Sequence, residues 1–282
     1  NPSDKVLISS PIYQNFYTWI KETKVTMIDV PYIKDASTED GTGWRHDWDG
    51  IEKAYQSGIK VHILCSPHNP LGKVYSKADL IRIAALAKKN NVIVISDEIH
   101  APLTFKEQPF TPFLSIGSDA AEVGISVTAA SKGWNIAGLK CAIIISQSPK
   151  MHEKLNELAP AMHYRASLIG AFATVAAFEK GDEWLDSALV ILDENRKLVS
   201  NLISSRIPAI GYNLPHCSYL AWLDLSQLNL GDDPCAVLVE RAKVAFNPGH
   251  IYGALGKDYA RLNFATSPEI ITEAIDRIAS AL

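Results

Sequence analysis

The sequence predicts an α/β fold in which a mostly parallel central sheet is covered by helices, followed by a smaller α+β domain at the C-terminal end. Short apolar runs alternate with helical patterns through the first half of the chain, which favours parallel strands joined by helices. Several runs are apolar throughout, as is typical of strands covered on both faces. The alternation ends near residue 148, where the second part begins.

Six apolar runs in the first half are candidate strands of the central sheet. They lie at 6–10, 25–30, 61–66, 92–97, 124–129 and 141–146. Residues 76–90 have a helical pattern, in which Ser76 can cap the first turn and Asp79 follows three residues later. An apolar stripe along the same segment gives this helix a face to bury, formed by Leu80, Ile83, Ala84 and Ala87.

The second part of the chain begins with three helical segments and ends with a mixed pattern. The expected helices are 149–159, 167–180, 182–205, 233–244 and 268–281, and the expected strands are 218–225 and 259–265. Ser267 followed by Pro268 is a good start for the last helix, because a cap residue precedes proline at the first helical position. We therefore expect a large domain over 1–182 and a small domain over 183–282.

Composition excludes several classes of protein. Hydrophobic residues make up 47% and charged residues 21% of 282, as in globular proteins, so disorder is excluded. A formal net charge of -4 indicates neither nucleic acid nor anionic lipid as a partner, and no apolar run is long enough to cross a bilayer. The four cysteines form no CxxC pair or zinc spacing, so we expect free thiols in a cytoplasmic protein and no metal site.

Some common catalytic motifs are absent from the sequence. GxGxxG, GxxxxGK[ST], HExxH and GxSxG do not occur, which argues against a nucleotide enzyme, a zinc protease or a serine hydrolase. Polar residues stand instead at the ends of apolar strands. Ligands bind at this edge of open α/β sheets.

Asp97 and Lys132 are the strongest candidates at this edge. Asp97 directly follows the apolar run VIVIS, where it is either a turn or helix-cap residue or a buried anion that keeps a heterocyclic nitrogen protonated. Lys132 is either a solvated surface group or a nucleophilic amine. The second alternative follows from its neighbours, because small residues and a tryptophan allow a ligand to approach closely and the amine to be partly desolvated.

Four further residues are weaker candidates, each with an ordinary structural alternative. Asn69 belongs to an Asn-Pro pair that favours a turn. Tyr13 lies at helical spacing from later apolar residues and is a candidate for the core. Arg261 is either a surface ion-pair residue or a buried cation between apolar strand residues, and His100 is either a loop residue or part of the site.

Taken in order, these motifs resemble those of the fold-type-I pyridoxal phosphate (PLP) enzymes of the class I/II aminotransferase superfamily. The matching elements are P-x-Y, S-P-x-N-P-x-G, an apolar strand ending in D-E-x-H, S-K-x-x-N-x-A-G-L, and R-L-N-F. They span essentially the whole chain. The segments DEIHAPL (97–103), SKGWNIAGLKCA (131–142) and NPGHIYG (247–253) are most similar to the bacterial cystathionine β-lyases, a group of β-C–S lyases.

The resemblance implies a role for each motif residue. Lys132 would bind PLP covalently, and Asp97 would pair with the pyridinium nitrogen. Asn69 would donate a hydrogen bond to the phenolic oxygen of the ring, and Tyr13 would stack on the ring face. Arg261 would bind the substrate carboxylate with its two-pronged guanidinium.

The sequence also departs from the pattern of many aminotransferases. His100 stands where many of them have a tyrosine that contacts the phenolic oxygen, and the lyase group also has histidine there. Ala129 stands where many relatives have a phosphate-binding serine, so Thr128, Ser131 or Lys140 is expected to replace it.

The phosphate site has a further departure. The superfamily's glycine-containing loop and helix N-terminus, which hold the phosphate, should precede Tyr13, and residues 1–10 contain no match. We therefore expect that an N-terminal part of a family-length chain is missing from this sequence.

These features lead to an expected activity. The leading hypothesis is PLP-dependent β-elimination from L-cystathionine or a related cysteine S-conjugate, which yields pyruvate, ammonia and a thiol. The alternative is transamination between an amino acid and a 2-oxo acid, because both reactions begin by removing the same α-proton. A third hypothesis is a non-catalytic interaction protein on the same scaffold. By analogy with the superfamily, the expected assembly is a homodimer.

Overall fold

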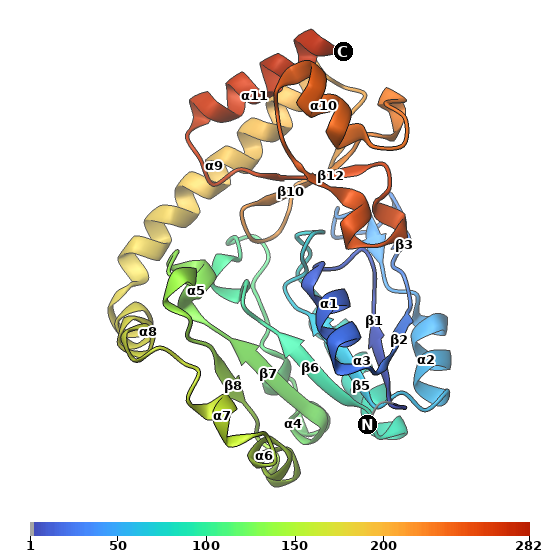
Figure 1. Cartoon of the computed structure of the whole chain (residues 1–282), viewed down its shortest axis with the longest axis vertical. Coiled ribbons are helices and arrows are strands. Elements are labelled where there is room, and N and C mark those ends of the chain that lie inside the picture. The colour runs from blue at the N-terminus through green and yellow to red at the C-terminus, as the bar shows by residue number, and fades with distance from the viewer. Residues whose placement is uncertain (1–2) are drawn as a thin grey trace.

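The computed structural model describes residues 3–282, apart from the side chain of His163. A six-stranded sheet has the order β2-β1-β5-β6-β7-β8 (Figure 1). Its strands are β1 (Lys5–Ile8), β2 (Thr26–Asp29), β5 (Val61–Cys65), β6 (Ile93–Asp97), β7 (Gly124–Thr128) and β8 (Ile143–Ile145). All neighbours pair in parallel except β7 and β8, which are antiparallel. The six predicted strands and the mostly parallel sheet are confirmed.

Helices cover both faces of this sheet. They are α1 (Asn15–Thr23), α2 (Trp48–Gln56), α3 (Lys77–Asn90), α4 (Ser118–Val123), α5 (Ala130–Gly133), α6 (Pro149–Asn156), α7 (Pro160–His163) and α8 (Leu168–Lys180). The side chains of β1 alternate between the two faces. Val6 and Ile8 pack with Phe16 of α1, whereas Leu7 packs in a larger core with residues of α2, α3 and α4. This alternation buries β1 on both sides.

The predicted helix starts agree with the capping contacts. Ser76 caps α3, where its side chain accepts a hydrogen bond from the backbone N–H of Asp79. Ser267 caps the last helix, α11 (Pro268–Ala281), by accepting from the N–H of Ile270. Each cap satisfies a backbone donor that the helix itself leaves unpaired.

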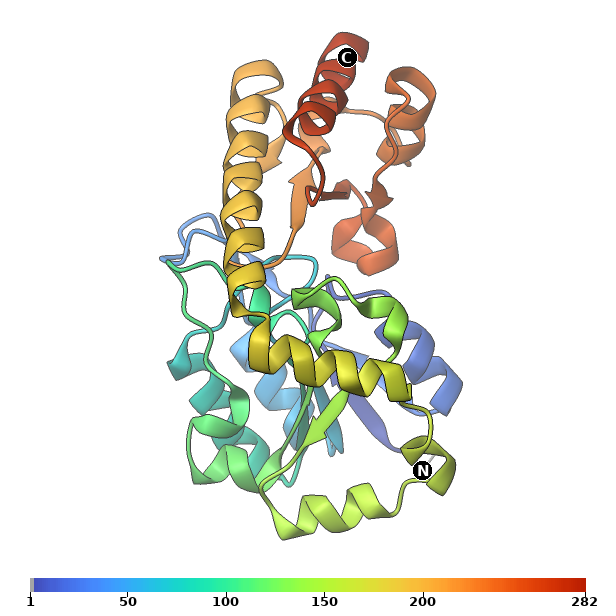
Figure 2. The ribbon, with the colours of Figure 1, turned by 90° about the vertical axis from the view of Figure 1, so that its left-hand side faces the viewer.

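The C-terminal part of the chain forms a second group of helices and strands, which has its own hydrophobic core. The long α9 (Asp182–Arg206), α10 (Pro234–Ala242) and α11 pack with a four-stranded antiparallel sheet, order β11-β12-β10-β9 (Figure 2). Its strands are β9 (Gly211–Tyr212), β10 (Leu220–Asp224), β11 (Asn247–Pro248) and β12 (Tyr259–Asn263). Leu103 and Phe105, from the segment after β6, also belong to this core. The division at 182/183 stays a prediction, and residues 1 and 2 of the predicted first domain lie outside the described residues.

A short hairpin, β3 (Ile33–Lys34) with β4 (Trp44–Arg45), adds a separate two-stranded sheet. Within residues 3–282, no helix is both long enough and apolar enough to cross a bilayer.

The apolar run at 141–146 is not covered on both faces, contrary to the sequence-based expectation. Ile143, Ile144 and Ile145 are 38%, 50% and 41% exposed. The reason is position, because β8 is the last strand of the sheet and pairs only with β7 in the described part of the chain. An apolar composition therefore marks a strand here but does not show that it is central.

Arg196 fixes α9 to the segment that enters the second sheet. Its guanidinium donates to the carbonyl oxygen of Pro215 at 2.9 Å and to Glu107 at 3.1 Å, and it also pairs with Asp193. The guanidinium carbon lies 4.0 Å from the ring centroid of Phe105. The side chain is buried, so these partners replace the water that it loses.

We expect Arg196→Met to lower the free energy of unfolding by about 2 kcal/mol, because the buried Pro215 carbonyl loses its charged donor. The matched control is Lys197→Met, since Lys197 is an exposed neighbour that pairs only with Asp193 among the ion pairs of residues 3–282. Urea denaturation of the three proteins measures the difference. Equal losses in both variants would contradict the role of Arg196.

Candidate active site

A cavity of about 480 Å³ lies at the carboxyl ends of β5 and β6, between the two sheets. We call it the Lys132 cavity. Seven predicted site residues line it: Tyr13, Asn69, Asp97, His100, Ser131, Lys132 and Arg261. The parallel strands end at one edge of the sheet, and the loops that follow them meet there. Residues as far apart in sequence as 13 and 261 therefore face one space.

Asp97 and Lys132 reach this cavity from neighbouring strands. Asp97 is the last residue of β6, and Lys132 lies in α5, directly after β7. Burial raises the pKa of Asp97 to about 6, although the backbone N–H of Ile99 donates to its carboxylate at 3.2 Å and Lys132 favours the anion. The two side chains thus share one small cavity, as the sequence-based hypothesis requires.

Arg261 and Asn69 join the second sheet to the loop after β5. The Nη1 of Arg261 donates to the Oδ1 of Asn69 at 3.0 Å, and its Nη2 donates to the Oδ1 of Asn247 at 3.2 Å. The guanidinium carbon lies 5.0 Å from the ring centroid of Tyr252. Within residues 3–282 no carboxylate pairs with Arg261. The alternative of a surface ion pair is therefore wrong.

The contact with Arg261 also fixes the orientation of the Asn69 amide. Because Oδ1 accepts from the guanidinium, the Nδ2 group remains as the donor that Asn69 can offer to the cavity. The side chain is buried. Asn69 is therefore suited to bind an oxygen anion.

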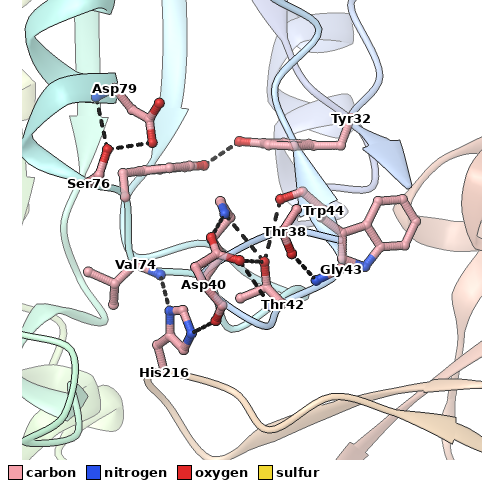
Figure 3. A network of polar contacts seen from close by, with 12 residues as sticks. Tyr32, Thr38, Asp40, Thr42, Gly43, Trp44, Val74, Ser76, Asp79 and His216 are labelled. Carbon is pink, nitrogen blue, oxygen red and sulfur yellow. Dashed lines mark hydrogen bonds and ion pairs between the residues drawn. The ribbon is translucent and has the colours of Figure 1, made fainter. Parts of the chain in front are cut away.

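A polar network holds the loop that carries Asn69 (Figure 3). Lys73 is buried and pairs with Asp40, whose backbone carbonyl also contacts the Nε2 of His216 at 2.8 Å. The backbone N–H of His216 donates to the carbonyl of Gly72 at 2.7 Å. Two segments distant in sequence therefore brace the loop.

Gly72 allows the chain to turn within this network. Its φ of +63° is in the left-handed region, and a Cβ atom built there would lie 2.4 Å from the Cβ of Pro215. Only glycine satisfies both the backbone angle and this close approach.

His100 and Tyr13 complete the walls of the Lys132 cavity. His100 is buried, and burial, together with the positive charges of Lys132 and Arg261, lowers its pKa to about 3, so the imidazole is neutral. The hydroxyl of Tyr13 accepts a hydrogen bond from the Nδ2 of Asn15 at 2.8 Å, and its ring meets Trp19 edge to face at 6.3 Å. Tyr13 is half-buried, so it both packs against the core cluster that contains Phe16 and lines the cavity.

Two predicted phosphate-binding residues are not part of the cavity lining. Thr128 is the last residue of β7 and pairs with Ile143 of β8. Lys140 lies eight residues beyond Lys132, at a left-handed position with φ +54°. Of the three candidates, only Ser131 lines the Lys132 cavity.

The structure adds lining residues that the sequence-based analysis did not single out. The most prominent are Trp19, Tyr219, Asn247 and Asn263. Asn247 and Asn263 lie within the motifs NPGHIYG and RLNF, so these motifs could have identified them as site residues. Trp19 and Tyr219 carried none, since each resembles an ordinary apolar residue of a helix or strand.

The donor set fits the aromatic part of PLP. Asp97 is a half-buried carboxylate without a hydrogen-bonded cation among residues 3–282, which suits a protonated ring nitrogen. An amine, an amide donor, a neutral imidazole and an aromatic ring face the same space, from Lys132, Asn69, His100 and Tyr13. No group of three or more His, Cys, Asp or Glu side chains is arranged to hold a metal ion in that same range.

Comparisons with known proteins agree with this arrangement. The model of the family described as aminotransferase class I and II matches residues 1–278. Cystathionine beta-lyase of Corynebacterium glutamicum is 34% identical over 100% of this chain and 72% of its own length, and cystathionine beta-lyase PatB of Bacillus subtilis is 31% identical with the same coverage. The crystal structure of cystalysin from Treponema denticola, which contains a pyridoxal 5'-phosphate cofactor, superposes with a TM-score of 0.92 at 28% identity, covering 100% of this chain and 71% of that one.

The raised pKa of Asp97 predicts a pH-dependent stability of the protein without cofactor. Well below pH 3.8 the carboxyl is protonated in both the folded and the unfolded state, so burial carries no ionisation penalty. Between about pH 3.8 and 6 the unfolded state ionises while the folded state stays protonated, so the free energy of unfolding falls by about 3 kcal/mol over this range and no further above it.

Asp97→Asn removes this penalty. Relative to the wild type, the variant is expected to be equally stable near pH 3 and more stable at pH 6 and above, as measured by chemical denaturation across the pH range. Parallel stability curves for the two proteins would refute the assignment.

Proposed function

We infer that this chain, which belongs to the class I and II aminotransferase family, is a PLP-dependent carbon–sulfur lyase. It cleaves L-cystathionine or a related cysteine S-conjugate by β-elimination. The overall reaction converts the S-conjugate and one water into a thiol, pyruvate and ammonium. The single observation that carries the proposal is the meeting of Lys132, Asp97 and Arg261 around one cavity, in a chain whose relatives bear the name cystathionine beta-lyase.

Four side chains would hold the ring of the cofactor. Asp97 would pair with the ring nitrogen and keep it protonated, because an adjacent anion favours a cation. Asn69 would donate its Nδ2 hydrogen to the phenolic oxygen, since its Oδ1 is occupied by Arg261. Tyr13 would lie against the ring face, and the neutral imidazole of His100 would face the ring edge.

When bound, PLP supplies an electron sink for the charge that develops at the α-carbon of the amino acid. Lys132 serves as the covalent anchor and then as the base that takes the α-proton. Arg261 binds the α-carboxylate with two N–H groups, so the α-carbon is held toward Lys132. The electron pair left by the α-proton finally breaks the bond between the β-carbon and sulfur, and sulfur leaves as a thiolate that is protonated to the thiol.

The phosphate would be held in part by Ser131, which lines the Lys132 cavity. Thr128 and Lys140 are proposed to contribute from beyond the cavity wall. These three assignments rest on the family motif around Lys132 and not on an observed contact with a phosphate group.

The assembly and location are proposed on separate grounds. A homodimer is the arrangement expected for the family, whose sites form where two subunits meet. The four cysteines are free in the structure, as suits a reducing compartment such as the cytoplasm.

The two candidate reactions differ in their need for a second substrate. We expect the protein to release pyruvate from L-cystathionine through many turnovers without any added 2-oxo acid, as measured by a coupled lactate dehydrogenase assay. An aminotransferase would stop after one half-reaction. Exchange of amino groups with a 2-oxo acid without pyruvate release would establish the alternative activity.

Lys132→Ala is the matched variant for this assay. It removes both the covalent anchor and the base, so visible absorbance of bound PLP and pyruvate formation should both disappear. Wild-type protein that stays colourless with added PLP would instead favour the third hypothesis, an inert interaction protein.

Arg261→Lys tests binding of the α-carboxylate. Lysine keeps the charge but loses the paired donors, so KM for the amino acid should rise about tenfold while the visible absorbance of bound PLP is retained. Steady-state kinetics of pyruvate release measures the change. Arg277→Lys, on the exposed face of α11 where Arg277 pairs with Glu273, serves as the control and should leave KM unchanged.

A further inference from the structure

A second cavity of about 460 Å³ opens beside the Lys132 cavity, between α5 and the first half of α9. We call it the α9 cavity. Lys132, Tyr219 and Asn263 line both cavities, so the residue that carries the proposed catalytic amine borders both. Figure 1 shows α5 beside the lower part of α9.

Direct contacts fix this relative position of α5 and α9. The indole Nε1 of Trp134, the residue after α5, donates to the carbonyl of Gly181 at 2.9 Å. A Cβ atom on Gly133 would lie 3.8 Å from a methyl of Leu185 in α9. The wall formed by α9 is therefore held next to the residues that follow Lys132.

The lining of the α9 cavity combines apolar side chains with the polar residues Asn135, Asn195, Tyr219, Asn263 and Thr266. Its apolar side chains come mainly from α9 and are Trp184, Ala188, Ile191 and Leu192, with Leu103 opposite. Apart from Lys132, no charged side chain among residues 3–282 lines it. The Lys132 cavity, by contrast, contains both Arg261 and Asp97.

The polar groups of the α9 cavity are partly committed to the protein itself. The Nδ2 of Asn195 donates to the carbonyls of Phe264 and Thr266 at 2.9 and 2.8 Å. The Oδ1 of Asn263 accepts from the backbone N–H of Ala265 at 2.8 Å. These contacts occupy part of the polar lining, and apart from Lys132 the described lining residues offer no charged partner for an ammonium or a carboxylate.

We propose that the α9 cavity receives the sulfur substituent of the substrate and selects uncharged alkyl or aryl thioethers over charged ones. The inference rests on the proposed function. With the α-carboxylate at Arg261 and the α-carbon at Lys132, the side chain of the substrate would extend past Lys132, which borders both cavities, toward the α9 cavity. There an uncharged substituent buries apolar surface against α9, whereas a charged one meets no charged side chain other than the catalytic amine.

The consequence is a preference among cysteine S-conjugates. S-ethyl-L-cysteine and S-carboxymethyl-L-cysteine are similar in size and differ in the charge of the substituent. We expect kcat/KM for pyruvate release by the PLP-loaded protein to be about tenfold higher for S-ethyl-L-cysteine. L-cystathionine, whose distal end carries an ammonium and a carboxylate, should also be poorer than S-ethyl-L-cysteine.

Ile191→Lys tests the wall directly, and Val190→Lys is its matched control. The two residues are neighbours on α9 with exposures of 54% and 55%, but only Ile191 lines the α9 cavity. A cation at 191 should shift the ratio of kcat/KM values about tenfold toward S-carboxymethyl-L-cysteine. The same charge at 190 should shift the ratio less than about twofold, because Val190 does not line the α9 cavity.

Equilibrium binding gives a readout that does not depend on turnover. 4-Phenylbutyrate offers one carboxylate and an apolar arm, whereas glutarate offers two carboxylates. Isothermal titration calorimetry should show tighter binding of 4-phenylbutyrate to the wild type, and Ile191→Lys, but not Val190→Lys, should improve binding of glutarate.

The outcomes separate the two proposals. No pyruvate from any S-conjugate would refute the lyase function, while the calorimetric comparison still decides the inference. A wild type that favours S-carboxymethyl-L-cysteine or glutarate would overturn the inference even if the lyase activity is present. Equal effects of the two lysine variants would also overturn it.

Discussion

The hydrogen bond between Arg261 and Asn69 is the contact on which the site depends. It joins residues 192 positions apart, one on β12 of the second sheet and the other on the loop after β5. This one interaction thus places the guanidinium of Arg261 and orients the side-chain amide of Asn69. Because the guanidinium also contacts Asn247 and lies over Tyr252, its position is fixed by neighbours from three segments, and a ligand meets a preorganised pair of donors.

Two side chains of the Lys132 cavity are held in an electrostatically unfavourable environment. Asp97 is a carboxylate that burial disfavours, and His100 is a histidine that burial keeps neutral. Neither arrangement stabilises the fold by itself. Under the proposed function, a cationic ring nitrogen beside Asp97 and a ring edge beside His100 would offset this cost, so the two groups would favour that ligand over others.

Most of the sheet and part of the site could be predicted from the sequence. The apolar runs mark the six strands of the central sheet (β1, β2, β5, β6, β7 and β8) because such runs have a strong and local signal, and Asp97 and Lys132 stand out because each follows such a run. The short α4 and α5 and the two-residue strands were missed, since a few residues carry too little periodicity. Trp19 and Tyr219 could not be found because their place in the Lys132 cavity depends on packing between distant segments. The exposure of β8 likewise depends on its place at the sheet edge, which composition does not encode.

That edge position of β8 has a consequence for the sheet. In the described part of the chain β8 pairs only with β7, and its three isoleucines are partly exposed. An unpaired side of a strand is a template for another extended segment. A further strand aligned there would continue the six-stranded sheet and cover part of this apolar surface, and a lysine in place of one isoleucine would oppose such pairing.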